Sequence, residues 1–110
     1  MSKKHKPNNY FHVGTFVRKN DRVLTPLKGA PFGHLDTYVK RTGRIYRRRK
    51  YKWNGRAFVD LDVADKHKDY DHAHDIKGNN RAKVDRPLTK REARELNRLK
   101  KKRRYWKNDE

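Results

Sequence analysis

The run Asp71-His72-Ala73-His74-Asp75 places two histidines two residues apart, with an aspartate on each side. On an extended segment, side chains two residues apart point to the same side, so the histidines would face one way and the aspartates the other. Two such imidazoles beside Lys or Arg suit cleavage of an RNA phosphodiester without a metal. One histidine takes the proton of the ribose 2′-hydroxyl, the other protonates the leaving 5′-oxygen, and the cations stabilise the charge on the phosphorane.

The same residues allow two other interpretations. His67, His72 and His74, together with some of the nearby aspartates, could bind a divalent metal ion. They could also form a surface cluster of histidines that has no chemical role. Because His-x-His is a weak motif by itself, spacing alone leaves acid–base chemistry, metal binding and no function open.

The segment around these histidines is acidic, although the whole chain is strongly basic. The protein has 32 Lys and Arg against 13 Asp and Glu, which gives a net charge of +19. Residues 60–75 hold six of the acids and three of the six histidines. An excess of one sign weakens the compact state through self-repulsion, so we infer that it serves a polyanionic partner. The acidic segment either balances basic neighbours or forms a site.

Composition excludes several classes of protein. The chain has no cysteine, which excludes disulfide scaffolds, thiolate zinc sites and cysteine nucleophiles. No apolar run approaches the ~18 residues of a membrane span, and the basic start lacks the apolar run of a secretory signal. We therefore expect a cytoplasmic protein with no membrane partner. Only 20 of the 110 residues are Leu, Ile, Val or Phe, but 12 are aromatic, which favours a small core with unstructured charged ends.

Local patterns predict an α+β fold, namely a small twisted antiparallel β-sheet with a C-terminal basic helix and a disordered N-terminal tail. Alternation of apolar and polar residues predicts strands over 11–17 and 34–39. Asn54-Gly55 lies between two alternating runs and predicts a β-hairpin of 44–53 with 56–63, because both turn residues accept a positive φ.

Two registers of this hairpin place a cation opposite Asp60. A two-residue turn pairs Asp60 with Arg49, whereas a three-residue turn with a bulge pairs it with Lys50. We expect the second register, because it gathers apolar side chains on one face of the hairpin. Those side chains are Tyr51, Trp53, Val59, Leu61 and Val63. In either register, cross-strand ion pairing is the structural explanation for the aspartates of this strand.

We divide the chain into a disordered basic tail over 1–10, a β-rich core domain over 11–87 and a basic C-terminal helix over 88–110. Within the core domain, residues 64–86 show no strand or helix period and include Gly78-Asn79-Asn80. We expect a long loop there that carries the site, since long loops inside compact domains are usually functional or disordered.

The C-terminal helix has a sequence signal for its start. Thr89 and Glu92 are spaced as a capping box, in which each side chain accepts a hydrogen bond from the other residue's amide. We expect the helix to run to Trp106, with one narrow apolar stripe and cations on its other sides. The cations that we expect to bind nucleic acid are Lys28, Arg47, Arg48, Arg49, Lys50, Lys77, Arg98, Lys101 and Arg104.

The motifs over residues 27–76 resemble the toxin family numbered type 24 of bacterial polymorphic toxin systems, whose relatives also occur at the ends of phage structural proteins. The shared order is a basic strand, the Asn54-Gly55 turn, an Asp60-Leu61-Asp62 strand, His67 and then His72-Ala73-His74. The stretch 28–36 resembles the opening of the family's domain. The resemblance implies the fold that groups barnase, EndoU, the tRNase colicins and RelE, and it implies a metal-independent ribonuclease.

The resemblance also implies roles for individual residues. His72 and His74 would carry the proton transfers, with His67 and Asp62 in the same site. The basic flanks of the histidine segment, rather than the resemblance, predict that Arg81 or Lys77 stabilises the phosphorane. No cofactor and no metal would be needed. The substrate would be RNA, such as tRNA or rRNA, and an acidic immunity protein would be a further partner.

Two other functions stay open. One is a non-catalytic nucleic-acid-binding protein, associated with a phage or a ribosome, for which the charge and exposed aromatic residues suffice. The other is a metal-dependent HNH-like nuclease, suggested by Asp71-His72 ahead of a basic helix that contains Asn97.

Overall fold

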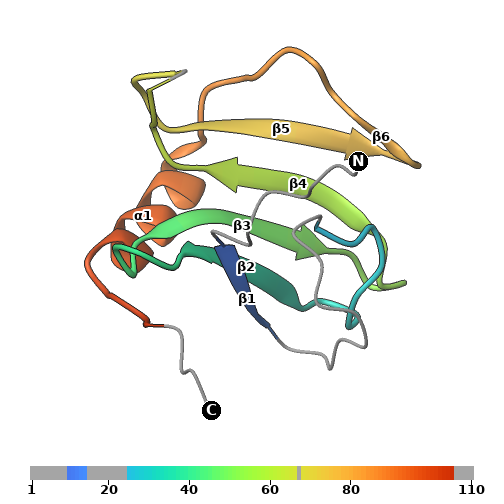
Figure 1. Ribbon diagram of the computed structural model, residues 1–110. Helices are drawn as coiled ribbons and strands as arrows, with labels where there is room; N and C mark the ends of the chain where they lie inside the picture. The colour runs from blue at the N-terminus through green and yellow to red at the C-terminus, as the bar shows by residue number, and fades with distance from the viewer. Residues whose placement is uncertain (1–9, 15–24, 67, 106–110) are drawn as a thin grey trace, which may run out of the picture.

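The computed structural model describes residues 10–14, 25–66 and 68–105. Within these ranges the secondary structure consists of strands β1 Tyr10–Gly14, β2 His34–Val39, β3 Ile45–Tyr51, β4 Ala57–Asp62, β5 His72–Lys77 and β6 Asn80–Arg81, and helix α1 Lys90–Lys100. The strands form one antiparallel sheet in the order β1-β2-β3-β4-β5-β6, and α1 lies against one face of it (Figure 1). The predicted α+β class, with a small antiparallel sheet and a C-terminal basic helix, is confirmed.

The N-terminal part of the chain differs in its boundaries from the predicted tail and first strand. Residues 1–9 of the predicted disordered tail lie outside the described residues, and Tyr10, which we assigned to that tail, is the first residue of β1. The strand predicted over 11–17 ends at Gly14, and 15–24 also lie outside the described residues. In the part of the chain that is described, no helix has the length and apolar character needed to cross a membrane.

Most of the hydrophobic core lies between the sheet and α1. Buried apolar side chains of β4 and β5 pack with Leu96, which is fully buried, and those of β1, β2 and β3 contact Leu99. The first group is Val59, Leu61 and Ala73, and the second is Phe11, Tyr38 and Ile45. Ion pairs add to this contact, because Arg48 and Lys50 on β3 bind the carboxylate of Glu95 at 2.7 and 2.9 Å. The apolar stripe of the helix is narrow, and these ion pairs flank it.

The helix begins as predicted but ends earlier. The Glu92 amide donates to the Thr89 hydroxyl at 3.1 Å and the Thr89 amide donates to the Glu92 carboxylate at 2.9 Å, so the capping box is present. The helix ends at Lys100 rather than at Trp106. Residues 100–104 are all Lys or Arg, and they repel one another without any apolar side chain to bury. The chain leaves the helix there, and the Arg104 amide donates to the Gly43 carbonyl at 2.9 Å.

Replacing Thr89 by alanine is expected to lower the free energy of unfolding by about 1 kcal/mol, because the Glu92 amide loses its hydrogen-bond acceptor. Urea denaturation followed by circular dichroism measures this change. Thr89→Ser, which keeps the hydroxyl, is the control and should stay close to the wild type. An unchanged stability in Thr89→Ala would contradict a stabilising role for the cap.

The other face of the sheet is partly covered by residues 25–33. Leu27 packs there against Leu35, Tyr51, Ala57 and Ile76, which form a second small core. This segment is joined to β4 by a backbone hydrogen bond of 2.9 Å from the Ala57 amide to the Leu27 carbonyl. The same segment reaches the polar part of this face, where Arg49 donates to the Thr25 carbonyl at 2.8 Å.

The predicted hairpin is confirmed, but its register differs from the expected one. The chain reverses at Asn54-Gly55, where Gly55 has a φ of 79°. Arg49 lies opposite Asp60, as in the two-residue-turn alternative, and a bulge between Lys50 and Tyr51 shifts the pairing close to the turn. Tyr51 therefore faces away from α1, whereas Val59 and Leu61 face it. The prediction of a single apolar face was wrong, because α1 packs on one face of the sheet and residues 25–33 pack on the other.

The expected loop over 64–86 was also wrong, because it contains β5 and β6. His72 lies opposite Asp62 and His74 opposite Asp60, so β5 extends the sheet beyond β4. Residues after β6 return along β5, where the amides and carbonyls of Ala73 and Arg86 exchange hydrogen bonds of 2.9 and 2.8 Å. The strand lacked an apolar alternation because one of its faces carries the histidines. Main-chain pairing on both edges forms the strand in spite of this composition.

Candidate active site

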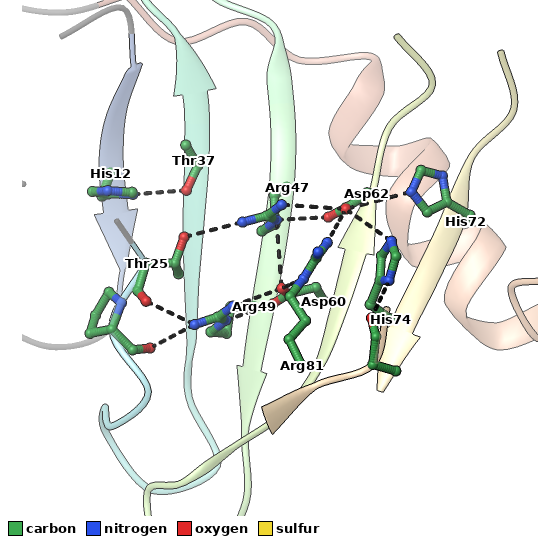
Figure 2. Close-up of polar contacts among 12 residues, drawn as sticks. His12, Thr25, Thr37, Arg47, Arg49, Asp60, Asp62, His72, His74 and Arg81 are labelled. Atoms are coloured by element: carbon green, nitrogen blue, oxygen red, sulfur yellow. Dashed lines mark hydrogen bonds and ion pairs between the residues drawn. The ribbon is translucent and has the colours of Figure 1, made fainter. Parts of the chain in front are cut away.

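The face of the sheet away from α1 carries a row of polar side chains contributed by all six strands (Figure 2). At one end, His12 of β1 contacts the Thr37 hydroxyl of β2 at 2.8 Å. At the other end lie the two histidines of β5. Between them, arginines from β3 and β6 meet aspartates from β4. Neighbouring strands thus place side chains of opposite charge directly beside one another.

Asp60 is the centre of this charged cluster and is fully buried. Arg49 binds both of its carboxylate oxygens at 2.6 and 2.8 Å, and the Arg81 Nε atom donates to it at 2.8 Å. Burial alone would raise the pKa of Asp60, but the hydrogen bond from Arg49 and the charges of Arg47 and Arg49 outweigh it, so its pKa is lowered. Asp60 is therefore charged at neutral pH, and it pairs with Arg47, Arg49 and Arg81.

Replacing Asp60 by asparagine is expected to lower the free energy of unfolding by about 3–5 kcal/mol, because it leaves the buried Arg49 charge uncompensated. Urea denaturation measures this loss. The pKa of Asp60 is lowered in the folded state, so its stabilising contribution is complete above the ordinary aspartate pKa of about 3.9 and is lost as the pH falls through the folded pKa. Destabilisation of the wild type through this group should therefore appear only below about pH 4.

Asp75 provides the control for this substitution. It also lies on the sheet and pairs with Arg86 at 3.0 Å, but its side chain is 48% exposed. Asp75→Asn should change the free energy of unfolding by less than about 1 kcal/mol, as is usual for an exposed ion pair. Equal losses in the two variants would show that burial of Asp60 is not the cause.

Asp62 connects the arginines to the histidines. Arg47 Nε donates to one of its oxygens at 2.8 Å, and Arg81 Nη2 donates to the other, Oδ2, at 2.7 Å. The same Oδ2 atom lies 3.6 Å from His72 Nε2 and 4.0 Å from His74 Nε2. Burial lowers the pKa of Arg47, but the charge of Asp62 and its hydrogen bond outweigh this effect, so the net direction is upward. Arg47 therefore stays charged beside the histidines.

Each histidine is oriented by the main chain. The Nδ1 atom of His72 contacts the Tyr70 carbonyl at 3.0 Å, and that of His74 contacts the Ala82 carbonyl at 2.9 Å. Because a carbonyl oxygen can only accept, each Nδ1 must carry the hydrogen. In its neutral form each ring therefore presents an unprotonated Nε2 atom, and both Nε2 atoms face Asp62 (Figure 2). Both rings are about 6% exposed, with centroids 5.0 Å apart.

A pocket of about 210 Å³ opens beside these groups. It is lined by Tyr46, Arg47, Asp62, Val63, Asp65, Lys68, His72, His74 and Arg81. Pockets for drug-sized ligands usually measure about 300–1,000 Å³, so this one suits a smaller group such as a phosphate with its ribose oxygens. Two imidazoles and two guanidinium groups thus line a space of suitable size for a phosphodiester.

The charges of the cluster favour an anion. Three arginines oppose two aspartates, so the cluster carries one net positive charge when both imidazoles are neutral. Asp62, His72 and His74 could also hold a divalent metal ion, since one ligand atom of each lies within 4.8 Å of the others. The backbone carbonyls behind both rings are typical of metal-binding histidines. However, such an ion would compete with Arg81 for Asp62 Oδ2 and would add positive charge to a positive cluster.

The structure brings four of the predicted catalytic residues together, namely Asp62, His72, His74 and Arg81. His67 lies outside the described residues. Lys77 ends β5, is exposed, and does not line the pocket. The sequence interpretation did not include Asp60 in the site, although the alternating charges of β3 and β4 were a signal for it. The carbonyls that orient the histidines carried no signal, because any residue supplies a carbonyl.

Of the nine predicted nucleic-acid-binding residues, four are bound within the protein or line the pocket, and five are exposed. Arg49 is 5% exposed and bound to Asp60, and Arg48 and Lys50 lie on the helix face and bind Glu95. Arg47 lines the pocket. The remaining five are exposed, and they are Lys28, Lys77, Arg98, Lys101 and Arg104.

Helix α1, which carries Asn97, lies across the sheet from the histidines, so these groups do not share one pocket as an HNH-like site would require. Comparisons with protein-family models, curated proteins and solved structures found no match to this chain.

Proposed function

We propose that this protein is a metal-independent ribonuclease that acts in the cytoplasm on RNA such as tRNA or rRNA. The observation that supports this function best is the arrangement of His72 and His74. Both rings have their Nδ1 hydrogen fixed by a carbonyl, so both exchange protons at Nε2, and both Nε2 atoms face one pocket with Arg47 and Arg81. This arrangement supplies a base, an acid and cations to one phosphate.

In the proposed step, the neutral imidazole of one histidine removes the proton from the ribose 2′-hydroxyl through Nε2. The 2′-oxygen attacks phosphorus, and the bond from phosphorus to the 5′-oxygen breaks. The imidazolium of the other histidine gives its Nε2 proton to the leaving 5′-oxygen. The products are a 2′,3′-cyclic phosphate and a 5′-hydroxyl end. Asp62 lies beside both rings, with its Oδ2 atom 3.6 Å from His72 Nε2 and 4.0 Å from His74 Nε2.

The test is incubation of the purified protein with total RNA in EDTA, followed by analysis of the fragment ends. We expect cleavage without metal, ends with 2′,3′-cyclic phosphate, and no cleavage of 2′-O-methyl RNA, which has no 2′-hydroxyl. Cleavage only after addition of a divalent metal would assign the reaction to a metal at Asp62, His72 and His74. Absence of cleavage under every condition would leave a non-catalytic nucleic-acid-binding protein.

The metal-dependent reaction is the second candidate, and the spacing of Asp62, His72 and His74 is the observation that favours it. The variant Arg81→Met separates the two candidates. If a metal acts at these residues, removal of the competing guanidinium should strengthen metal binding and keep activity. If the metal-independent reaction holds, the same variant loses a group that stabilises the phosphorane, and its cleavage rate should fall.

A further inference from the structure

Two large apolar side chains project into solvent at the end of the sheet where β3 turns into β4. Phe32 is 79% exposed and Trp53 is 68% exposed. They belong to neighbouring segments, because the Phe32 amide donates to the Lys52 carbonyl at 3.0 Å. Exposed aromatic rings that lie on adjacent segments mark a binding surface more often than isolated ones do.

The backbone at Phe32 adopts an unusual conformation. Among the described residues, Phe32 is the non-glycine residue with a positive φ, at 60°. A bulky side chain rarely adopts this conformation, because its Cβ atom approaches the following carbonyl oxygen. Strain of this kind persists where the surrounding structure imposes it, and it is frequent at functional sites. Here the turn over 30–33 imposes the conformation, because the Gly33 amide donates to the Ala30 carbonyl at 2.8 Å and the third residue of such a turn takes a positive φ. The ring that this turn carries is largely exposed.

The segment that carries Phe32 is fixed to the β3–β4 turn. The Gly29 amide donates to the Gly55 carbonyl at 2.8 Å, and the Tyr51 amide donates to the Gly33 carbonyl at 3.0 Å. A Cβ atom on Gly55 would lie 2.6 Å from the Gly29 carbonyl oxygen, so this close approach requires glycine. The two aromatic residues are therefore attached to a backbone that is already ordered.

The three described segments that form this end of the sheet carry only basic charges. Residues 25–33, 50–58 and 76–81 contain Lys and Arg but no Asp or Glu. The turn between β5 and β6 belongs to the same end of the sheet, because Arg56 donates to the Asn79 side chain at 3.1 Å. Aromatic rings among cations are the combination by which proteins bind single-stranded nucleic acid, with bases stacked on the rings and phosphates near the cations.

We propose that Phe32 and Trp53 form a stacking platform for unpaired bases of single-stranded RNA. This inference rests on the proposed function and adds to it the class of substrate. Residues 25–33 run from the pocket to the two exposed rings. Thr25 contacts Arg47, which lines the pocket, and the Phe32 amide donates to the Lys52 carbonyl. From Arg47 to Lys52 is five residues of extended chain, or ~17 Å. A stacked strand rises ~3.4 Å per nucleotide along its axis, so about five nucleotides cover this length.

The affinity test uses fluorescence anisotropy of a labelled, uncleavable 2′-O-methyl octauridylate and of a labelled RNA duplex. Loss of a stacked base lowers affinity by about 5- to 150-fold, so Phe32→Ala and Trp53→Ala should each weaken octauridylate binding within this range. Duplex binding should stay within about twofold, because paired bases cannot stack on the rings. Trp53→Phe, which keeps an aromatic ring, is the matched control and should retain most of the affinity.

Phe32→Gly tests the strain directly. Glycine adopts the positive φ without a clash, so this variant should be more stable than the wild type, with a Tm higher by about 4–8 °C. It should nevertheless lose octauridylate affinity as Phe32→Ala does. A lower Tm would show that the ring stabilises the fold and would overturn the platform. Unchanged affinity, or equal losses for octauridylate and duplex, would overturn it as well.

The platform and the ribonuclease function fail in different measurements. Anisotropy with the uncleavable oligonucleotide reports only on binding, whereas cleavage of total RNA reports only on the reaction. If the wild type binds octauridylate through both rings but cleaves no RNA, the platform holds and the proposed reaction is wrong. If it cleaves RNA but the ring variants bind normally, the reaction holds and the platform is wrong.

Discussion

His72→Ala and His74→Ala are each expected to lower the rate of RNA cleavage by about 10²–10⁴-fold, the usual contribution of a positioned general acid or base. RNA affinity should change little, because phosphate binding depends mainly on the cations. A carbonyl group fixes the orientation of each ring, so the ring that remains in either variant cannot move into the place of the lost one. Single-turnover cleavage at saturating enzyme measures the rate, and anisotropy with 2′-O-methyl RNA measures the affinity.

The pH dependence of the same reaction should be bell-shaped, since one imidazole must be protonated while the other is neutral. The two limbs report on the pair of imidazoles, because the reaction needs one ring in each protonation state. His12→Ala is the control, since His12 lies on the same face but contacts Thr37 on β2 instead of the pocket. A flat pH profile, or an equal loss of rate in His12→Ala, would argue against the proposed proton transfers.

RNA affinity is expected to fall by about 10³–10⁵-fold between 50 and 200 mM salt if roughly 6–10 phosphates are contacted, because each neutralised phosphate releases its counterion. The excess of cations that drives this effect is the +19 net charge. Many of these cations are exposed on α1 and on the residues that follow it, including Arg98, Lys101 and Arg104. Anisotropy titrations at several salt concentrations give the slope of log affinity against log salt.

Lys101 and Lys102 offer a local test of this prediction, because both are exposed. The double change to glutamine should make the slope shallower by up to about 2, one for each phosphate contact removed. The double change to arginine keeps both charges and should keep the slope. Affinity that does not depend on salt would refute a polyanionic partner as the reason for the basic composition.

The elements with local signals were predicted correctly. Asn54-Gly55 specified the hairpin because Gly55 accepts the positive φ of the turn, although Asn54 does not adopt one. The Thr89 and Glu92 pair specified the start of α1 because its hydrogen bonds are local. The register and β5 depended on distant contacts instead. Residues 25–27 and α1 pack on opposite faces of the sheet, and this packing selects the register in which Asp60 pairs with Arg49. The hairpin sequence alone does not indicate that either segment packs there.

Most residues of the candidate site could be predicted from the sequence, but the contacts among them could not. The side-by-side orientation of His72 and His74 followed from a spacing of two residues, and it holds on β5. The position of Arg81 beside Asp62 follows from the short turn between β5 and β6, which we had assigned to a loop. Asp60 was left out of the site because ion pairing across a hairpin explained it. In the structure Asp60 also pairs with Arg47 and Arg81, which line the pocket.

The order of the strands has a consequence for how the chain folds. Each strand of the sheet pairs with the strand that follows it in sequence, so the sheet grows by short-range steps without a crossover. Pairing of consecutive strands costs less loop entropy at each step than pairing across a crossover would. Packing of α1 on the sheet is a long-range step instead, because Glu95 and Arg48, which form an ion pair, are 47 residues apart in the chain. A nascent chain would therefore form the hairpins as they emerge during synthesis and would close its main core only after the helix has been made.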